Sequence, residues 1–167
     1  MKSFFEWIRD MPFEVRKGEK GYLADITYIL RERRGSCSPK HYLLGRIYEK
    51  MGLDVVYMIH PFLWQDQNID FPNSLKKLSK RMPMCFHLNI SANNLLFDAT
   101  WDPPLARAGF IVNEILSMKN GVLSCGESTI QPNRQEQTPA QERNQAEDDV
   151  RWEFYSQLNK WLNSLRE

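Results

Sequence analysis

Three residues of this sequence have the side chains of a nucleophilic site: Cys37, His87 and Asp98, in that chain order. A histidine can remove the proton of a thiol, and a carboxylate can hold the imidazole tautomer and stabilise the imidazolium. The thiolate then attacks a carbonyl carbon, and water or an amine releases the acyl group. This chemistry requires local structure that brings residues 37, 87 and 98 together.

Cys37 is predicted to lie at or just before the start of a helix. Ser38 suits the N-cap, Pro39 the first helical position, and Gly52 the residue just past the last turn. Between them, apolar residues recur at helical spacing: Tyr42, Leu43, Leu44, Ile47, Tyr48 and Met51. Unpaired N–H groups and the dipole at a helix start favour the thiolate over the thiol.

His87 and Asp98 are predicted to lie on two antiparallel strands, Met84–Ile90 and Leu95–Ala99. A two-residue loop at Ala92-Asn93 would place His87 directly across from Asp98. Side chains opposed in this way have Cβ atoms about 4.5–5.5 Å apart, which allows a hydrogen bond.

Side-chain alternation supports this register. One face of the hairpin would be polar, with His87, Asn89 and Asp98. The other face would be apolar, with Phe86, Leu88, Ile90, Leu95, Phe97 and Ala99.

The remaining histidines and cysteines are weaker candidates. His41 is a rival base four residues after Cys37, but it has no acidic partner nearby and is expected on the surface. His60 precedes a proline and is expected to be structural or exposed. Cys85 shares the face of His87, but neither it nor Cys125 has a helix start to lower its pKa. Three widely separated cysteines make no disulfide framework, and without paired metal-ligand spacing we expect no metal or cofactor.

These residues resemble the transglutaminase-like superfamily, a branch of the papain-like cysteine-enzyme fold that includes many small prokaryotic proteins. The R-x-G-x-C block is present as Arg33, Gly35 and Cys37. A helix that ends in glycine then enters a hydrophobic strand, in IYEKMGLDVVYM, and the histidine and aspartate strands follow in HLNISANNLLFDATWD. The similarity covers about residues 21–104.

The resemblance implies an α+β fold, in which the Cys37 helix and other helices pack on a small antiparallel sheet. It also implies that Cys37 is the nucleophile, His87 the base and Asp98 the orienting acid. Two positions depart from the family pattern: Asn89 stands where an aromatic residue is frequent, and Ala99 where proline is usual. Both departures bear on the substrate cleft.

The rest of the chain is expected to form one domain around this core. Residues 126–149 are polar and are expected to form a flexible linker, before an amphipathic helix at 150–166 that packs on the core. Trp64 and Trp101 are expected in the core or the cleft wall, and the basic cluster at residues 76–81 in solvent.

The other expected elements are a helix with Phe4, Phe5, Ile8 and Met11 inward, a helix with Leu23, Ile26, Thr27 and Leu30 inward, a strand buried on both faces at Leu53–Ile59 that ends at His60-Pro61, a helical turn at Leu75–Leu78, a helix at Ile111–Met118, and a short strand or loop at Val122–Cys125.

Composition excludes several classes of function. The 167 residues carry a net charge of +1, which offers no field for nucleic acid or an anionic membrane. No stretch is apolar enough to span a bilayer, and the charged opening is unlike a secretory signal, so we expect a cytoplasmic setting. The oligomeric state stays open.

The expected function is acyl transfer from an amide or peptide, by hydrolysis or by transfer to a small amine, with a protein or peptide as substrate. The Cys37 backbone N–H is expected to bind the oxyanion, and the sequence names no second donor. Two alternatives stay open. One is a binding module that keeps the fold without the activity, and the other is an acyltransferase similar to arylamine N-acetyltransferases.

Overall fold

The structure is a computed structural model that describes residues 2–17, 21–114, 116–117, 133–134 and 145–167. Helices and strands mix along the chain in an α+β order. The helices are α1 (Lys2–Arg9), α2 (Tyr22–Glu32), α3 (Cys37–Lys50), α4 (Asn73–Ser79) and α5 (Gln145–Ser164), with short 3-10 helices at Trp64–Asp66 and Pro103–Ala108. The strands are β1 (Val55–Phe62), β2 (Cys85–Ala92), β3 (Leu95–Phe97), β4 (Leu116–Ser117) and β5 (Asn133–Arg134).

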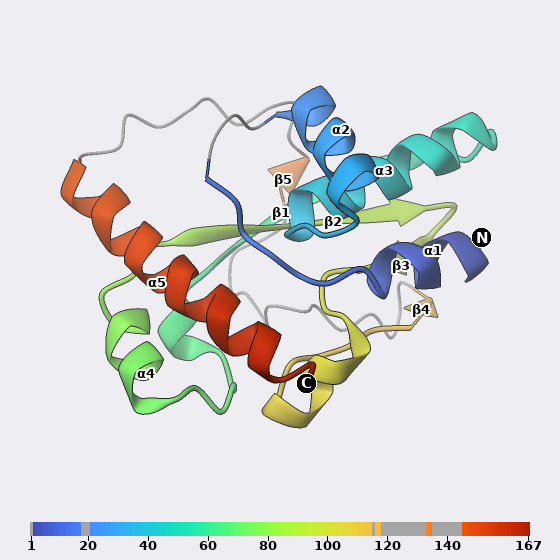
Figure 1. Cartoon of the computed structure of the whole chain (residues 1–167). Helices are drawn as coiled ribbons and strands as arrows, with labels where there is room; N and C mark the ends of the chain where they lie inside the picture. The colour runs from blue at the N-terminus through green and yellow to red at the C-terminus, as the bar shows by residue number, and fades with distance from the viewer. Residues whose placement is uncertain (1, 18–20, 115, 118–132, 135–144) are drawn as a thin grey trace.

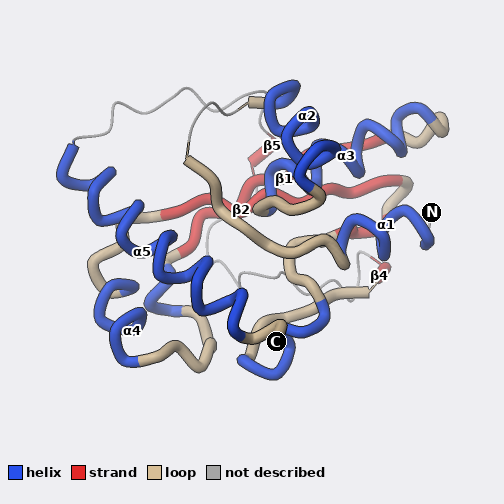
Figure 2. The backbone as a smooth tube through the Cα atoms, viewed as in Figure 1, coloured by secondary structure: helices blue, strands red, loops and turns tan. Residues whose placement is uncertain are grey.

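An antiparallel sheet of β1, β2 and β3 forms the centre of the fold, with two-residue strands on its edges in the order β4-β3-β2-β1-β5. The helices gather at its two ends (Figures 1 and 2). α1, α2 and α3 lie toward the end where β2 turns into β3, whereas α4 and α5 lie near the start of β2.

The β2–β3 turn is one residue later than the sequence predicted. Asn93 and Asn94 are the turn residues, with φ of 47° and 62°, so Ala92 pairs with Leu95 rather than lying in the loop. This is the two-residue turn that needs positive φ at both positions, and asparagine tolerates that conformation better than alanine. The predicted register, with His87 directly across from Asp98, is therefore wrong, although the same residues share a face.

Two hydrophobic clusters flank the middle of β2. The α3 cluster is made of Phe5, Ile8, Met11, Ile29, Leu43, Leu44, Tyr48, Ile90, Ala92, Phe97 and Ala99. The α5 cluster is made of Phe13, Trp64, Leu75, Leu78, Met82, Cys85, Trp101, Leu105, Ala108, Phe110, Phe154, Leu158 and Leu162. Because Cys85 belongs to one cluster and Ile90 to the other, residues 86–89 lie between them.

α2 buries a different face from the one predicted. Leu23 and Leu30 are exposed, at 74% and 46%, and the buried residues are Asp25 and Ile29. Arg16 donates to Asp25 at 3.0 Å and makes its burial tolerable. An apolar pattern cannot reveal an inward face that carries a paired charge. In α1, likewise, Phe5 and Ile8 are buried but Phe4 is exposed.

The predicted helix at residues 111–118 is wrong for the part that the structure describes. Residues 111–114 form no regular secondary structure, and Leu116–Ser117 is β4. Phe110 and Asn113 are buried here, and Ile111 is exposed. Val122–Cys125 and most of the predicted linker lie outside the described residues.

β1 does not end at His60-Pro61 but continues to Phe62. His60 is its one buried residue, so the strand is half-buried rather than buried on both faces. Met58 and Ile59 are the residues of β1 that pair with β5. Pro61 lies beyond them, so its lack of an N–H removes no hydrogen bond from the β1–β5 ladder.

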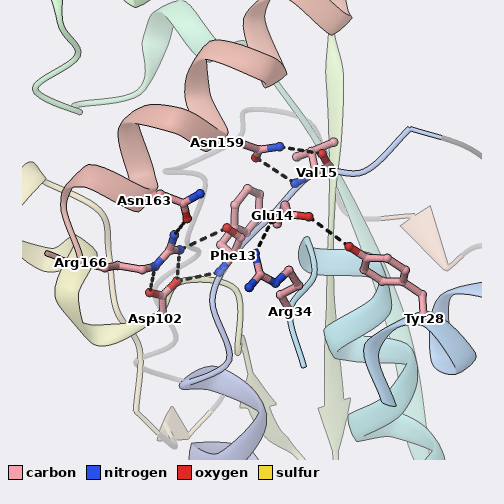
Figure 3. A network of polar contacts seen from close by, with 9 residues as sticks. All are labelled: Phe13, Glu14, Val15, Tyr28, Arg34, Asp102, Asn159, Asn163 and Arg166. Atoms are coloured by element: carbon pink, nitrogen blue, oxygen red, sulfur yellow. Dashed lines mark hydrogen bonds and ion pairs between the residues drawn. The ribbon is translucent and has the colours of Figure 1, made fainter. Parts of the chain in front are cut away.

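α5 docks on an extended stretch near the other end of the chain (Figure 3). The Asn159 side chain accepts from the Val15 N–H at 3.1 Å and donates to the Val15 carbonyl at 2.8 Å. At the end of the chain, Arg166 donates to both carboxylate oxygens of Asp102 at 2.7 and 2.8 Å, and Asp102 also accepts from the Phe13 N–H at 2.8 Å. Polar contacts thus set the position of α5 along this stretch.

The Arg166–Asp102 pair is expected to carry much of this docking. Asp102 is 2% exposed, and Arg166→Met removes the only cation bonded to it among the described residues. An uncompensated buried carboxylate costs about 3 kcal/mol, so we expect a loss of about that size in the free energy of unfolding, measured by urea denaturation. The matched control is Arg81→Met: Arg81 lies 4.0 Å from Glu153 with both side chains at least half exposed, and we expect a change below about 0.5 kcal/mol. Equal losses in the two variants would contradict the role given to this pair.

Candidate active site

Cys37 is the first residue of α3, so the helix begins two positions earlier than the predicted caps imply. Ser36 occupies the N-cap position, and its side chain makes no capping hydrogen bond. The Gly35 N–H donates to the Pro12 carbonyl at 3.0 Å, and a Cβ on Gly35 would lie 2.9 Å from Pro39 Cγ. Glycine is therefore required at position 35, because any side chain there would clash with Pro39 in the first turn of α3. The Cys37 N–H is one of the first N–H groups of the helix, which have no intrahelical acceptor.

Cys37, His87 and Asp98 come together at this helix start. His87 Nε2 lies 2.8 Å from Asp98 Oδ2, and the Cys37 and His87 side chains are hydrogen-bonded to one another. With Nε2 directed to the carboxylate, Nδ1 is the ring nitrogen left for the sulfur. The second carboxylate oxygen accepts from Thr100 Oγ1 at 2.6 Å. The predicted contact between His87 and Asp98 is confirmed, although it is made diagonally across the strands.

The β2–β3 ladder stops just before the site. Ile90 and Phe97 are the last paired residues, and the hairpin geometry makes Leu88 and Ala99 the next pair that would exchange hydrogen bonds. They do not pair. Because their backbone groups are buried, they need other partners.

The first turn of α3 supplies these partners. The Leu88 N–H donates to the Cys37 sulfur, and the Ala99 N–H donates to His41 Nε2 at 2.8 Å. The sulfur therefore lies at the edge of β2, in the place that a continued β3 would occupy, and within reach of the His87 ring.

The electrostatics favour a charged pair of thiolate and imidazolium. Burial raises the pKa of the Cys37 thiol, but the hydrogen bond and charge of His87 together with the Leu88 N–H lower it more, so that the net pKa lies below the ordinary value. Burial lowers the pKa of His87, and Asp98 and Cys37 raise it well above the usual range. Burial opposes ionisation of Asp98 too, but His87, His41 and Thr100 hold its pKa far below normal.

The base and the acid of the site are more deeply buried than the residue that carries the thiol. His87 and Asp98 are 3% and 2% exposed, whereas Cys37 is half-buried. A hydrogen bond to a charged group is stronger away from water, so burial of the acid–base pair strengthens it. The residue that would meet a substrate is the one with exposed surface.

His41 and His60 also lie at this site, so all three histidines of the chain gather there. Both are buried, contrary to the surface position predicted for His41. His41 Nδ1 lies 2.8 Å from the Cys37 carbonyl. With Nε2 already accepting from Ala99, neither nitrogen can serve as a base. His60 is paired with His87 across β1 and β2, and its Nε2 lies 3.2 Å from Asn89 Oδ1.

Lys40 is a buried cation that sequence reasoning missed. Its Nζ donates to the Arg9 carbonyl at 2.9 Å and to the Thr100 carbonyl at 2.8 Å. Burial lowers its pKa to about 7, although Asp102 partly opposes this. A signal was present in the sequence: residues 37, 40 and 41 have the spacing of one helix face, and that face must be buried if Cys37 is to reach the strands.

The second described cysteine is inert by comparison. Cys85 is buried, and its sulfur lies 3.4 Å from Tyr155 Oη. Burial raises the pKa of the Cys85 thiol, which Tyr155 and Arg151 only partly offset. Cys125 lies outside the described residues. Trp64 and Trp101 are buried in the α5 cluster, as predicted.

Comparison of the chain with models of protein families, with curated proteins and with solved structures gave no match. Within the described ranges, no group of three or more His, Cys, Asp or Glu side chains could hold a metal ion. None of the described helices is long and apolar enough to cross a membrane.

The thiol of Cys37 is expected to react at lower pH than that of Cys85. We expect half-maximal alkylation of Cys37 well below the ordinary thiol pKa of about 8.5, measured site by site by mass spectrometry. Removal of the imidazole in His87→Gln should move this midpoint up to or above the ordinary value. His60→Gln is the control, since His60 bonds to Asn89 and not to the sulfur. Equal reactivity of Cys37 and Cys85 in the native protein would contradict the ion pair.

Lys40 is expected to make stability depend on pH. Its folded pKa of about 7 lies below the unfolded value of about 10.4, so between these values the unfolded chain holds a proton that the folded chain lacks. Stability therefore rises with pH across this window, by about 1.4 kcal/mol per pH unit from this group. In Lys40→Met this rise should be missing, and in Lys50→Met, on the exposed end of the same helix, it should remain. Parallel curves of unfolding free energy against pH for the native protein and Lys40→Met would rule out the effect.

Proposed function

We propose that this protein is a cysteine-dependent acyl-transfer enzyme that acts on amide or peptide carbonyls. The observation that carries the proposal is the continuous chain of hydrogen bonds from the Cys37 thiol through the His87 ring to Asp98, with the last link at 2.8 Å. The lowered pKa of Cys37 and the half-buried position of this residue add support. A thiol of this kind is a nucleophile near neutral pH.

The proposed reaction begins with the Cys37 proton on His87 Nδ1. The thiolate attacks the substrate carbonyl carbon, and the oxygen becomes an oxyanion that accepts from the Cys37 N–H at the start of α3. His87 gives its proton to the leaving nitrogen, the carbon–nitrogen bond breaks, and a thioester remains on Cys37. Water or a small amine then attacks the thioester carbonyl carbon and loses a proton to His87. The carbon–sulfur bond breaks, and the Cys37 sulfur leaves and takes up that proton as a thiol. Each proton is accounted for by His87, and the cycle uses no cofactor.

Asp98 has two tasks in this scheme. Its Oδ2 accepts from His87 Nε2, which directs Nδ1 to the sulfur and stabilises the imidazolium. Its Oδ1 is held by Thr100, so the carboxylate cannot rotate away from the ring. Asp98 stays ionised throughout, because its neighbours keep its pKa far below normal.

The resemblance to the transglutaminase-like superfamily supports this assignment. In this proposal the sheet of β1, β2 and β3 with α3 is a papain-like core, and the substrate is a protein or peptide. Both cysteines in the part of the chain that the structure describes are free, which suits a reducing compartment, so we propose a cytoplasmic setting. A binding module without activity would have no need of an ionised pair of Cys37 and His87. The charged pair therefore favours the enzyme.

The activity is testable with a glutamine-containing peptide and a labelled amine, with release of ammonia and incorporation of label followed separately. Cys37→Ala should abolish both. Asp98→Asn should lower kcat/KM by about 10²- to 10⁴-fold, the range in which acid–base catalysis contributes. Asp54→Asn, which alters an exposed aspartate in the turn before β1, is the control and should keep full activity.

Two results would redirect the assignment. Ammonia release without label indicates hydrolysis, and acetyl transfer to an arylamine in place of either reaction indicates the acetyltransferase-like alternative. Equal turnover by the native protein and Cys37→Ala overturns the proposal.

A further inference from the structure

His41 makes two hydrogen bonds that join different parts of the site. Its Nδ1 lies 2.8 Å from the carbonyl of Cys37, and its Nε2 accepts from the N–H of Ala99 at 2.8 Å. A backbone N–H can only donate and a carbonyl can only accept, so Nδ1 carries the proton and Nε2 is bare. The ring is therefore neutral and held in one tautomer.

The two atoms that His41 joins are close to two members of the proposed triad. One is the carbonyl of the nucleophile residue itself, and the other is the N–H of the residue after Asp98. His41 touches neither the thiol nor the carboxylate closely: its Nε2 is 3.7 Å from Asp98 Oδ1, and its ring centroid is 6.1 Å from that of His87, at right angles. It lies at the helix–sheet contact without access to a substrate, since it is fully buried.

We propose that His41 is a positioning residue, whose neutral ring ties the first turn of α3 to the segment after β3 and thereby holds the sulfur within reach of the His87–Asp98 pair. This inference rests on the proposed function. The register of the sheet explains why such a tie is needed. The ladder between β2 and β3 stops at Phe97, so beyond it side-chain contacts hold the segment that carries Asp98, among them those of His87 and His41.

The charged neighbours of His41 keep its ring neutral at working pH. Burial lowers its pKa to about 4, with the charges of His87 and Lys40 acting in the same direction against Asp98 and the Cys37 carbonyl. A protonated Nε2 could not accept from Ala99. The contact is therefore made at neutral pH.

A buried histidine with a purely structural role would affect stability alone, so the decisive readout is the reactivity of Cys37. His41→Phe keeps a ring of similar shape and removes both hydrogen bonds, whereas His41→Gln keeps an amide that can donate and accept. His60→Gln is the matched control, because His60 is also a buried histidine beside His87 but bonds only to Asn89 among the described residues.

Alkylation of Cys37 by iodoacetamide, followed against pH by mass spectrometry in the full chain, is the experiment. We expect the midpoint to rise by about one pH unit in His41→Phe, which corresponds to roughly tenfold slower alkylation on the acid side. His41→Gln should lie between His41→Phe and the native protein, and His60→Gln should match the native protein. An unchanged midpoint in His41→Phe, with native Cys37 reactive at low pH, overturns the positioning role and leaves the proposed function intact. A native Cys37 as unreactive as Cys85 overturns the proposed function instead.

A second measurement covers the case in which His41→Phe does not fold. In ¹⁵N-labelled native protein, long-range proton–nitrogen spectra report which nitrogen of each histidine carries the proton. We expect His41 to be protonated on Nδ1 alone from neutral pH down to about pH 5. The opposite tautomer, or titration near the ordinary histidine value of about 6.5, overturns the proposal.

Discussion

The interruption of the β2–β3 ladder after Phe97 is the constraint on which the candidate site depends. A continued ladder would pair Leu88 with Ala99 and leave no room for a sulfur at the edge of β2. Instead, the buried backbone groups at this point are satisfied from a helix, by three side chains on one face of its first turn: Cys37, Lys40 and His41. Cys37 therefore also belongs to the hydrogen-bond network of the sheet, and this places its sulfur beside the His87 ring.

The position of this network between two apolar clusters explains its electrostatics. Residues 87–89 lie buried between the α3 cluster and the α5 cluster, so the polar groups there interact with one another instead of with solvent. Almost all of them have partners. The exception among the buried side chains at this seam is Asn89, whose Nδ2 has none, although its Oδ1 contacts His60. Burial of an unpaired polar group costs free energy of folding. Asn89 stands at the position where the transglutaminase-like superfamily, which the sequence resembles, often has an aromatic residue.

Local sequence was enough to predict the elements of the site but not all of its contacts. Helical periodicity and Gly52 placed the start of the Cys37 helix to within two residues, and alternation assigned His87 and Asp98 to one face. The predicted turn, at Ala92-Asn93, lies one position before the observed turn at Asn93–Asn94. Because of this error, the prediction places His87 directly across from Asp98, whereas the contact between them is diagonal. The role of His41 could not be predicted, because both its partners are backbone atoms whose availability depends on where β3 ends. The buried face of α2 was misjudged for a similar reason, since Asp25 is buried only because Arg16 comes from another segment.

The end of the chain supports the start of α3 through the extended stretch at residues 12–15. On one side, this stretch receives α5, through Asn159 and Arg166. On the other side, the Pro12 carbonyl accepts from the Gly35 N–H, and Glu14 accepts from Arg34 at 3.0 Å. The loop that leads into Cys37 is thus packed against a segment that α5 itself holds. The resemblance leaves the C-terminal third without a counterpart, and these contacts give α5 a physical role: it supports the turn that leads into Cys37.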